Sequence, residues 1–391
     1  MATTTPSFSW PVPTSSDLVK NGATAIEALG DAIDASMTDL KGGTTGQVLA
    51  KATGTDMDFT WTTPSGGSSY VAGKNAWFNS AFDIWQRGTS STGTAYNYTA
   101  DRWLNYRGAF AAGATFSRVA STQTGFQYAL KAQRDSGNTG LDVLHLRQGL
   151  ETTDSLRFAG QTVTVSFYAK AGANFSPTSS ILVSTIYQGE GTDQAVNNMT
   201  GWTGVTAIAQ NNTLTTSWQR FTQTTTISSA KTQIGIAFTY TPVGTAGADD
   251  SYQITGVQIE TASTATSFSR QTGSIQGELA ACQRYYYLAA SGGVNLTVCP
   301  AHSYTSTQMN ATVTFPVTMR IAPTCISSSG TNYFSFNRNA GDDYLDSVTI
   351  LYPSTVSTNI YNNTNVSGTA GQAGTLYTYN ASATIAFNAE L

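Results

Sequence analysis

Apolar and polar residues alternate along much of this chain, which is the pattern of strands that bury one face. Residues 162–169 place Val, Val, Phe and Ala on one side and Thr, Thr, Ser and Tyr on the other. Similar alternation occurs at residues 234–240, 375–379 and 384–387. These runs predict a mostly β fold, with a large β-sandwich followed by a smaller C-terminal β-sandwich.

A different period governs residues 19–40, where apolar positions recur every seven residues. The seam positions of this pattern are Val19, Ile26, Ile33 and Leu40, with Gly22, Leu29 and Ser36 at the second position. The pattern predicts about three heptads of a coiled coil, and so short a helix is marginal in water unless copies associate. A helix that lies on a neighbouring domain fits the same pattern. The seam does not fix the number of copies.

Residues 252–288 join the two predicted sandwiches. Residues 252–260 predict the closing strand of the large domain, in which Ile254 and Val257 face opposite sides unless Gly256 forms a bulge. Downstream, Leu279, Cys282 and Tyr286 are three and four residues apart and predict a one-sided apolar helix. Leu279 is therefore a further candidate contact between domains or between subunits.

Composition and charge narrow the class of protein. Only 11% of the 391 residues are charged and the net charge is −4, with lysines and arginines scattered along the chain. A phosphate-neutralising patch is thus missing, and no nucleic-acid partner is expected. No apolar run approaches the roughly 20 residues of a membrane helix, and no basic start precedes an apolar stretch. We expect a soluble chain, made in a cytoplasm, without membrane insertion.

Candidate catalytic and metal-binding residues are few. Three cysteines without metal-ligand spacing are interpreted as small buried residues, and of the two histidines, His145 in a predicted strand is interpreted as structural. Acidic pairs such as Asp249-Asp250 and Asp342-Asp343 are typical of solvated turns. Glycan hydrolysis by two carboxylates and a calcium cluster are the alternatives. We expect no catalytic residue, no metal and no cofactor.

Sugar recognition needs an aromatic ring beside amide or charged groups. Trp202 with Asn198 lies in a polar, glycine-flanked stretch, where the ring either contacts a ligand or packs under its own loop or against another subunit. In the predicted distal domain the candidate glycan-binding residues, interpreted as loop residues, are Tyr333, Phe336, Arg338 and Tyr344. Trp85, Trp103 and Trp218 are interpreted as core residues.

Several short phrases resemble the tail-fibre and minor tail proteins of bacteriophages. They are WPVP at 10–13, GQVLAK at 46–51 with DFTW at 58–61, NSAFDIWQRG at 79–88 with ADRW at 100–103, VQIE at 257–260, LAACQRYY at 279–286 and FPVTMRIAPT at 315–324. The resemblance implies a jelly roll similar to carbohydrate-binding modules, in which the first and last strands lie side by side. That arrangement would bring the Phe82 region next to residues 257–260.

The resemblance also implies a domain layout and a function. Residues 1–40 would be a tail-attachment segment and coiled coil, 41–69 a small β unit and linker, 70–272 the jelly roll, and 273–391 a short helix and distal β-sandwich tip. The implied protein is a structural, non-enzymatic virion protein, a homotrimer that attaches to the phage tail or baseplate through residues 1–22, with Phe8 and Trp10. Its β domains would contact host surface polysaccharide or lipopolysaccharide. The alternatives are a purely structural neck or tail appendage and a glycan depolymerase spike.

Overall fold

The chain is mostly β, as the sequence predicts. The computed structural model describes all residues except 1–2, 15–17, 63–71, 93–95, 109–112 and 340. The chain divides into two compact units, Met1–Ser69 and Tyr70–Leu391. None of the described helices is long and apolar enough to cross a membrane.

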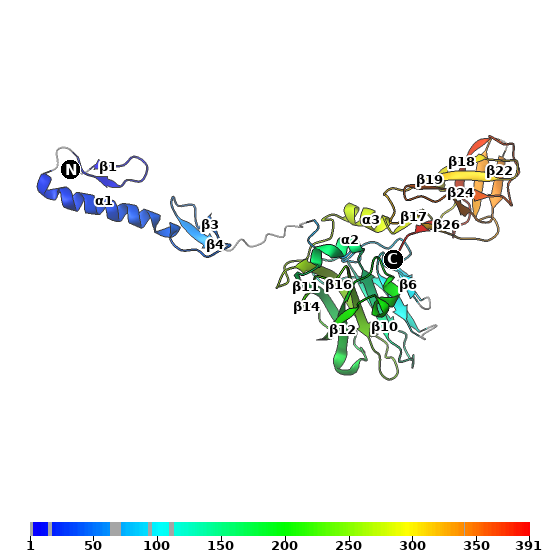
Figure 1. Ribbon diagram of the computed structural model, residues 1–391, viewed down its shortest axis with the longest axis horizontal. Helices are drawn as coiled ribbons and strands as arrows, with labels where there is room; N and C mark the ends of the chain where they lie inside the picture. Colours follow the sequence, from blue (N-terminus) through cyan, green and yellow to red (C-terminus); the bar gives the residue numbers. More distant parts are fainter. Residues whose placement is uncertain (1–2, 15–17, 63–71, 93–95, 109–112, 340) are drawn as a thin grey trace. The chain divides into compact units, whose positions relative to one another are not determined.

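The N-terminal unit contains one long helix and two small hairpins (Figure 1). Helix α1 (Gly22–Met37) is flanked by 3-10 turns at Val19–Asn21 and Thr38–Leu40, so the helix predicted over residues 19–40 is confirmed. Strands β1 (Thr3–Thr4) and β2 (Pro11–Val12) pair with each other. Strands β3 (Val48–Lys51) and β4 (Phe59–Thr62) form the second hairpin, at the predicted β unit.

The first hairpin occupies one face of α1. The Trp10 indole nitrogen donates a hydrogen bond to Ser36 Oγ at 3.0 Å, and the Phe8 ring stacks on Trp10 with centroids 5.0 Å apart. Trp10 is thus half-buried within its own unit, and the attachment role expected of Phe8 and Trp10 stays a prediction. Phe8 remains 46% exposed.

The predicted coiled-coil seam is divided between covered and open positions. Val19 is 97% and Ile26 65% exposed, whereas Leu29, Ile33 and Leu40 are half-buried. Ser36, at the second seam position, is already bonded to Trp10. The open apolar stripe consists of Val19, Ala23, Ile26, Gly30 and Met37, all of which are exposed. Its alternating spacing of four and three keeps one side of the helix free of charge.

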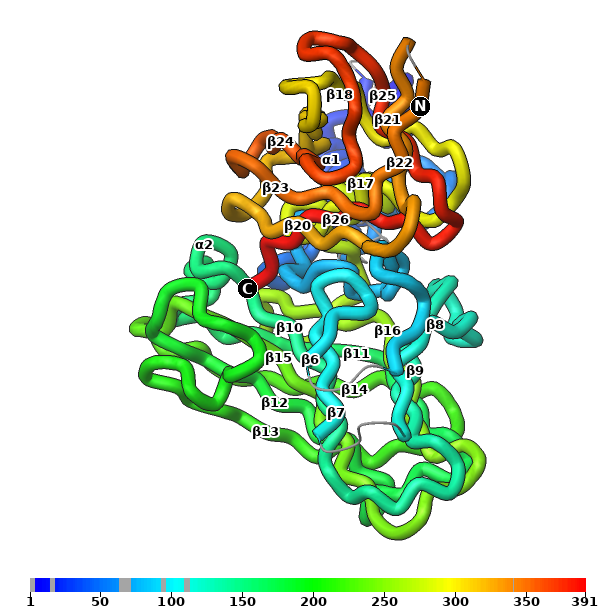
Figure 2. Tube along the Cα trace, turned by 90° about the vertical axis from the view of Figure 1, so that its right-hand side faces the viewer, coloured from blue at the N-terminus to red at the C-terminus, as the bar shows by residue number. Residues whose placement is uncertain are grey.

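Two six-stranded antiparallel sheets form the jelly roll (Figures 1 and 2). The first, called here the open sheet, has the order β13 (Thr206–Thr213), β12 (Ile181–Gly189), β15 (Gln233–Tyr240), β10 (Leu144–Gly149), β7 (Leu104–Arg107) and β6 (Tyr96–Tyr98). The second has the order β14 (Gln219–Thr226), β11 (Thr162–Ala171), β16 (Asp250–Thr261), β9 (Tyr128–Arg134), β8 (Ala114–Ala120) and β5 (Ser90–Ser91). Helix α2 (Thr152–Ser155) and 3-10 turns at Leu156–Phe158, Thr178–Ser180 and Val196–Gly201 lie in the connections.

The core of the jelly roll lies between these sheets. The alternating residues of β11 and β15 predicted to face inward, among them Val165, Phe167 and Phe238, are fully buried there. Trp103 is also fully buried, as interpreted from the sequence, while Trp85 is half-buried against the core. Trp218 is half-buried and donates its indole hydrogen to Thr122 Oγ1 at 2.9 Å.

The predicted bulge in the closing strand is present at Gly256. Ser166 of β11 faces Gln258 and Tyr168 faces Thr255, so one residue of β11 opposes two of β16. Gly256 has φ +62°, and a Cβ there would lie 2.5 Å from the Phe126 ring. Both the backbone angle and the close ring therefore require glycine.

The opening segment of the jelly roll lies beside this strand, as expected. Val257 N donates to Ser80 O at 3.0 Å, and the Asn75 side chain bonds to Val257 O and to Ile259 N. Residues 75–80 are not a strand. The buried Asn75 amide supplies hydrogen bonds that a neighbouring strand would otherwise make.

The C-terminal domain begins after helix α3 (Ile275–Gln283) and has a core of its own. One sheet has the order β17 (Tyr286–Ser291), β26 (Thr384–Asn388) and β20 (Thr324–Ser327). The other has the order β22 (Gly341–Leu345), β21 (Phe334–Arg338), β25 (Ala373–Thr378), β18 (Thr297–Ser303), β19 (Met309–Thr314), β24 (Ser357–Asn362) and β23 (Thr349–Leu351). Cys282 and Cys299 are buried and Cys325 is half-buried, all three as free thiols.

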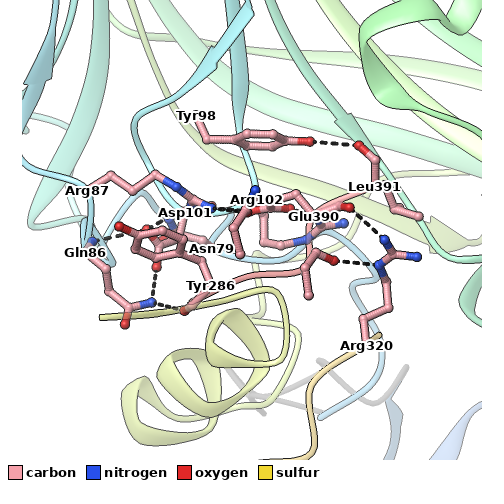
Figure 3. Close-up of polar contacts among 12 residues, drawn as sticks. Asn79, Gln86, Arg87, Tyr98, Asp101, Arg102, Tyr286, Arg320, Glu390 and Leu391 are labelled. Carbon is pink, nitrogen blue, oxygen red and sulfur yellow. Dashed lines mark hydrogen bonds and ion pairs between the residues drawn. The ribbon is translucent and has the colours of Figure 1, made fainter. Parts of the chain in front are cut away.

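Buried charges join this domain to the jelly roll (Figure 3). Glu390 forms ion pairs with Arg102 and with Arg87, the latter at 3.1 Å. The Arg87 guanidinium lies 3.6 Å from the centre of the Tyr286 ring, and that of Arg102 lies 3.5 Å from the Tyr285 ring. The sequence phrases at 79–88, 100–103 and 279–286 thus meet at one interdomain junction.

Candidate functional site

A continuous row of side chains crosses the outer face of the open sheet. Strand register places one residue of each strand directly opposite the next across all six strands. This open row consists of Tyr96, Tyr106, His145, Thr239, Val183 and Asn211. Tyr96 is 46% exposed, Asn211 is exposed, and the other four are half-buried. The row is therefore a solvent-accessible band across the sheet.

Three aromatic rings stand side by side at one end of the open row. The Tyr96 and Tyr106 rings stack with centroids 4.6 Å apart, and the His145 ring lies 5.8 Å from that of Tyr106. Because Tyr96 belongs to edge strand β6, the far side of its ring has no neighbouring strand. The ladder offers an aromatic surface at the sheet edge and polar ring atoms along its length.

His145 contributes a neutral hydrogen-bonding ring. Its Nδ1 lies 3.0 Å from Thr239 Oγ1. Burial, with a further contribution from the nearby Arg147 charge, lowers the pKa of His145 to about 3. The imidazole is therefore uncharged near pH 7, and a hydrogen-bonded structural histidine is what the sequence predicts at this position.

Part of the outer face beside the open row is covered by the connection between β12 and β13. Val196, Met199 and Trp202 pack with Leu104 in a small apolar cluster. Trp202 rests on glycines of the sheet: a Cβ at Gly235 would lie 2.8 Å from its ring, and one at Gly189 would lie 3.1 Å from it. The glycines in these strands make room for a bulky side chain, and this covering leaves the open row as the accessible band.

Trp202 follows the structural alternative predicted for it. The side chain is 3% exposed, and its indole nitrogen donates to Ala195 O at 3.0 Å, within its own loop. Neighbouring Asn198 is exposed, but Trp202 offers it no ring face to share with a ligand. The predicted pairing of these two residues in one glycan site is therefore not formed.

Phe336 and Arg338 lie in β21 and Tyr344 lies in β22, which corrects their interpretation as loop residues, while Tyr333 directly precedes β21. Phe336 is fully buried in β21, and Arg338 pairs with Asp343 at 2.6 Å. Tyr333 is half-buried, and Tyr344 is 40% exposed with its ring 4.6 Å from that of Tyr379. Phe334 and Phe336, two residues apart in β21, both belong to the buried core of the domain, so burial on one face of a strand rather than loop exposure explains these aromatic residues. A glycan-binding role for Tyr344 stays a prediction.

A broad cleft of about 810 Å³ opens at the junction between the two domains. Trp85, Asn97, Tyr98 and Tyr286 are among its lining residues. The faces of Tyr98 and Tyr286 are already used by Arg87, whose guanidinium lies 5.1 Å and 3.6 Å from the two ring centres. This cleft adjoins the open row through β6, which contributes to both.

The acidic residues considered for catalysis or metal binding have other partners. Asp250 pairs with Arg134 at 2.9 Å, Asp249 with Lys131 at 2.8 Å, and Asp346 accepts from Asn332 N. Among the described residues no three His, Cys, Asp or Glu side chains gather into a group that could hold a metal ion. These acids therefore have evident structural roles.

Comparisons with known proteins give limited structural likeness. No protein-family model matches the sequence, and no curated protein matches it. Similar solved structures include the xylan-binding CBM22-1 domain of Paenibacillus barcinonensis Xyn10C, with 16% identity over 50% of this chain and 98% of that domain, at a TM-score of 0.31. The active domain of tailspike protein 4 of bacteriophage CBA120 has 8% identity over 48% of this chain and 21% of that one, at a TM-score of 0.28.

A third similar structure is the TmCBM61 module in complex with β-1,4-galactotriose. It has 12% identity over 48% of this chain and 99% of that module, at a TM-score of 0.29. All three TM-scores are below 0.5. These likenesses therefore carry no inference about the function of this chain.

The sequence did not predict the open row as a site, because nothing in it connects these residues with one another. Tyr96 and Tyr106 lie on neighbouring strands, whereas His145 is 39 residues beyond Tyr106 and joins them only because β10 lies next to β7. The available signal was parity: Tyr96 and Tyr98, like His145 and Arg147, are two apart and share the outer face of their strands.

Proposed function

We propose that this protein binds glycan on the open row of the jelly roll. The observation that carries the proposal is the register of the row, which aligns two tyrosines, a neutral histidine, a threonine and an asparagine across one accessible sheet face. Sugars are recognised by aromatic surfaces that contact their C–H groups and by hydroxyl, amide and imidazole groups that bond their hydroxyls. The row supplies both kinds of group.

We further propose that the protein is a phage tail fibre that binds host surface polysaccharide or lipopolysaccharide. The phrases that resemble tail-fibre proteins support this role, and several of them form the buried interdomain junction. In this proposal the chain is made in the host bacterial cytoplasm and becomes part of the virion tail. Residues 1–22, with exposed Phe8, attach it to a tail or baseplate protein.

We propose that copies of the chain associate through the open apolar stripe of α1. Val19 and Ile26 supply its most exposed side chains, and the resemblance implies three copies. Half-buried Leu279 of α3 is a second proposed contact between copies. Several weak glycan sites held together bind a cell surface with an avidity that one site lacks.

The glycan-binding proposal is tested with the full chain and a panel of purified bacterial surface polysaccharides. Tyr96→Ala removes the exposed ring at the end of the ladder, and we expect it to weaken binding at least tenfold. Tyr344→Ala removes the exposed ring of the competing candidate site in the C-terminal domain, and this proposal expects it to leave binding unchanged.

The alternatives give different results in the same experiment. A purely structural appendage binds no member of the panel, in either variant or in the parent chain. A depolymerase releases reducing ends from a polysaccharide that it binds. Loss of binding in Tyr344→Ala, with normal binding by Tyr96→Ala, would move the site to the C-terminal domain.

A further inference from the structure

Arg147 is a buried cation on the outer face of the open sheet. It lies on β10, two residues from His145, and is 8% exposed. Its Nη1 donates to Asn197 O at 2.9 Å, whereas its Nε has no hydrogen-bond partner among the described residues. Within the same part of the chain, no carboxylate forms an ion pair with it. Its charge is therefore left without a counter-ion.

Three other buried arginines have carboxylate partners, whereas fully buried Arg107 on the neighbouring strand β7 has no ion pair among the described residues. Arg102 pairs with Glu390, Arg134 with Asp250 at 2.9 Å, and Arg338 with Asp343 at 2.6 Å. Burial of a charge without a partner is costly, because neither water nor an opposite charge stabilises it. A buried charge without a counter-ion that also lies beside a cleft is a candidate for binding an anionic ligand.

The surroundings of Arg147 act on its pKa in two directions. Burial lowers the pKa of Arg147, and the hydroxyl groups of Tyr187, Tyr96 and Tyr106 act in the opposite direction. Two of these tyrosines belong to the open row. Arg147 is thus within electrostatic reach of the same aromatic ladder that is proposed to contact sugar.

A cleft of about 250 Å³ lies beside this arginine. The cross-strand neighbour of Arg147, Leu104, lines it, as do Asn197, which accepts the Arg147 hydrogen bond, and Tyr96 of the open row. No Asp or Glu side chain is among the described lining residues, which are completed by Arg87, Asn97, Tyr98, Ile326, Asn388 and Leu391. The Arg87 charge is already shared with Asp101 and Glu390. Arg147 does not line the cleft itself, but it is one residue away from it through Leu104 and Asn197, and no ion pair among the described residues neutralises its charge.

We propose that the glycan bound here is acidic, and that Arg147 pairs with the oxyanion of one of its sugars. The guanidinium is planar and its donors match the two oxygens of a carboxylate or of a phosphate group. The shared chemistry is a sugar oxyanion, either the carboxylate of a uronic acid or the phosphate of a phosphorylated sugar. This inference rests on the proposed glycan-binding function and assigns the class of glycan to the same site.

The test uses the full chain on an array of matched oligosaccharides. Each uronic-acid glycan is printed beside its carboxyl-reduced counterpart, which has the same linkages without the charge, and each phosphorylated glycan beside its dephosphorylated form. We expect binding to acidic members of the array, reduced at least tenfold in the matched neutral members. The pair that shows this difference identifies the carboxylate or the phosphate as the source of the oxyanion.

Two variants assign the effect to Arg147. Arg147→Gln should reduce binding of the acidic member to the level of its neutral counterpart, and Arg147→Lys should retain part of the preference. Arg118→Gln, on β8 of the other sheet, is the matched control and should retain all of it. Thermal melting of each variant checks that it is folded, and loss of the unpaired charge in Arg147→Gln should not lower the melting temperature.

The outcomes separate this inference from the function on which it rests. Equal binding to charged and neutral members would overturn the acidic-glycan inference and leave glycan binding intact. Acidic binding that survives in Arg147→Gln would overturn the role of Arg147. Binding to no member of the array would contradict both the inference and the proposed function.

Discussion

At the scale of single residues, Gly256 is the clearest case of a position fixed by its backbone and its neighbours. Its φ is +62°, and a Cβ would lie 2.5 Å from Phe126 and 3.0 Å from Tyr168. Gly256→Ala should destabilise the jelly roll by about 2–4 kcal/mol, from the left-handed backbone and the ring clash together. The matched control is Gly244→Ala, which has the same φ of +62° and no atom within 4 Å. Equal melting temperatures for the two variants would show that the rings move freely.

His145 gives a prediction on pH. Its pKa falls from the ordinary value near 6.5 to about 3 on folding, chiefly because the ring is buried. As the pH falls, His145 of the unfolded chain takes up a proton at a higher pH than His145 of the folded chain. The contribution of the neutral, buried ring to the free energy of unfolding is therefore fully present above pH 6.5 and is lost as the pH falls toward 3. Between pH 7 and pH 4 the loss should reach up to roughly 3 kcal/mol. His145→Gln should flatten the dependence of the melting temperature on pH over that range; an unchanged slope would contradict the assignment.

The conformation of a single residue could be predicted from the sequence where the local backbone determines it. It could not be predicted where residues distant in the chain determine it. The bulge at Gly256 follows from the conflict between Ile254 and Val257, which is readable in the chain. The burial of Trp202 depends on Gly235 and Gly189, which are distant in sequence and supply the space for its ring. Only the fold shows that these glycines lie beneath it.

At the scale of elements, the junction of the two β domains rests on Glu390. It is the carboxylate partner of Arg102, which is 1% exposed. Glu390→Gln leaves that guanidinium without a counter-charge and should destabilise the jelly roll and its neighbour by about 3 kcal/mol. The control is Asp34→Asn, since the Asp34–Lys41 pair is about 70% exposed on each side and its loss should cost under about 0.5 kcal/mol. Chemical denaturation measures both; equal effects would rule out a stabilising role for the junction.

The elements themselves were largely predictable, and their neighbours were not. The long helix and the strands of the jelly roll follow from periods of about 3.6 and 2 residues. The hairpin of β21 and β22 was interpreted as loops because its strands are short and polar. Strand order, which creates the open row, depends on contacts between residues distant in the chain. His145 lies beside Tyr106, 39 residues before it, and Thr239, 94 residues after it, and a hydrophobic period carries no record of such contacts.

At the scale of the whole molecule, association of copies is the first expectation. Ile26→Lys places a charge in the middle of the open stripe of α1 and should lower the molar mass measured by light scattering on the full chain. Thr24→Lys, at a position that is also exposed and lies outside the stripe, should leave the mass unchanged. An oligomer that persists in Ile26→Lys would place the contact between copies elsewhere, and Leu279→Glu would then test α3.

Glycan recognition by the jelly roll is the central claim, and an experimental structure of the full chain with an oligosaccharide from a polysaccharide that it binds tests it most directly. The account predicts sugar rings along the open row. These rings contact the side chains of Tyr96 and Tyr106, and an oxyanion of the glycan lies beside Arg147. A sugar bound at Tyr344 of the C-terminal domain, with the open row empty, would contradict it.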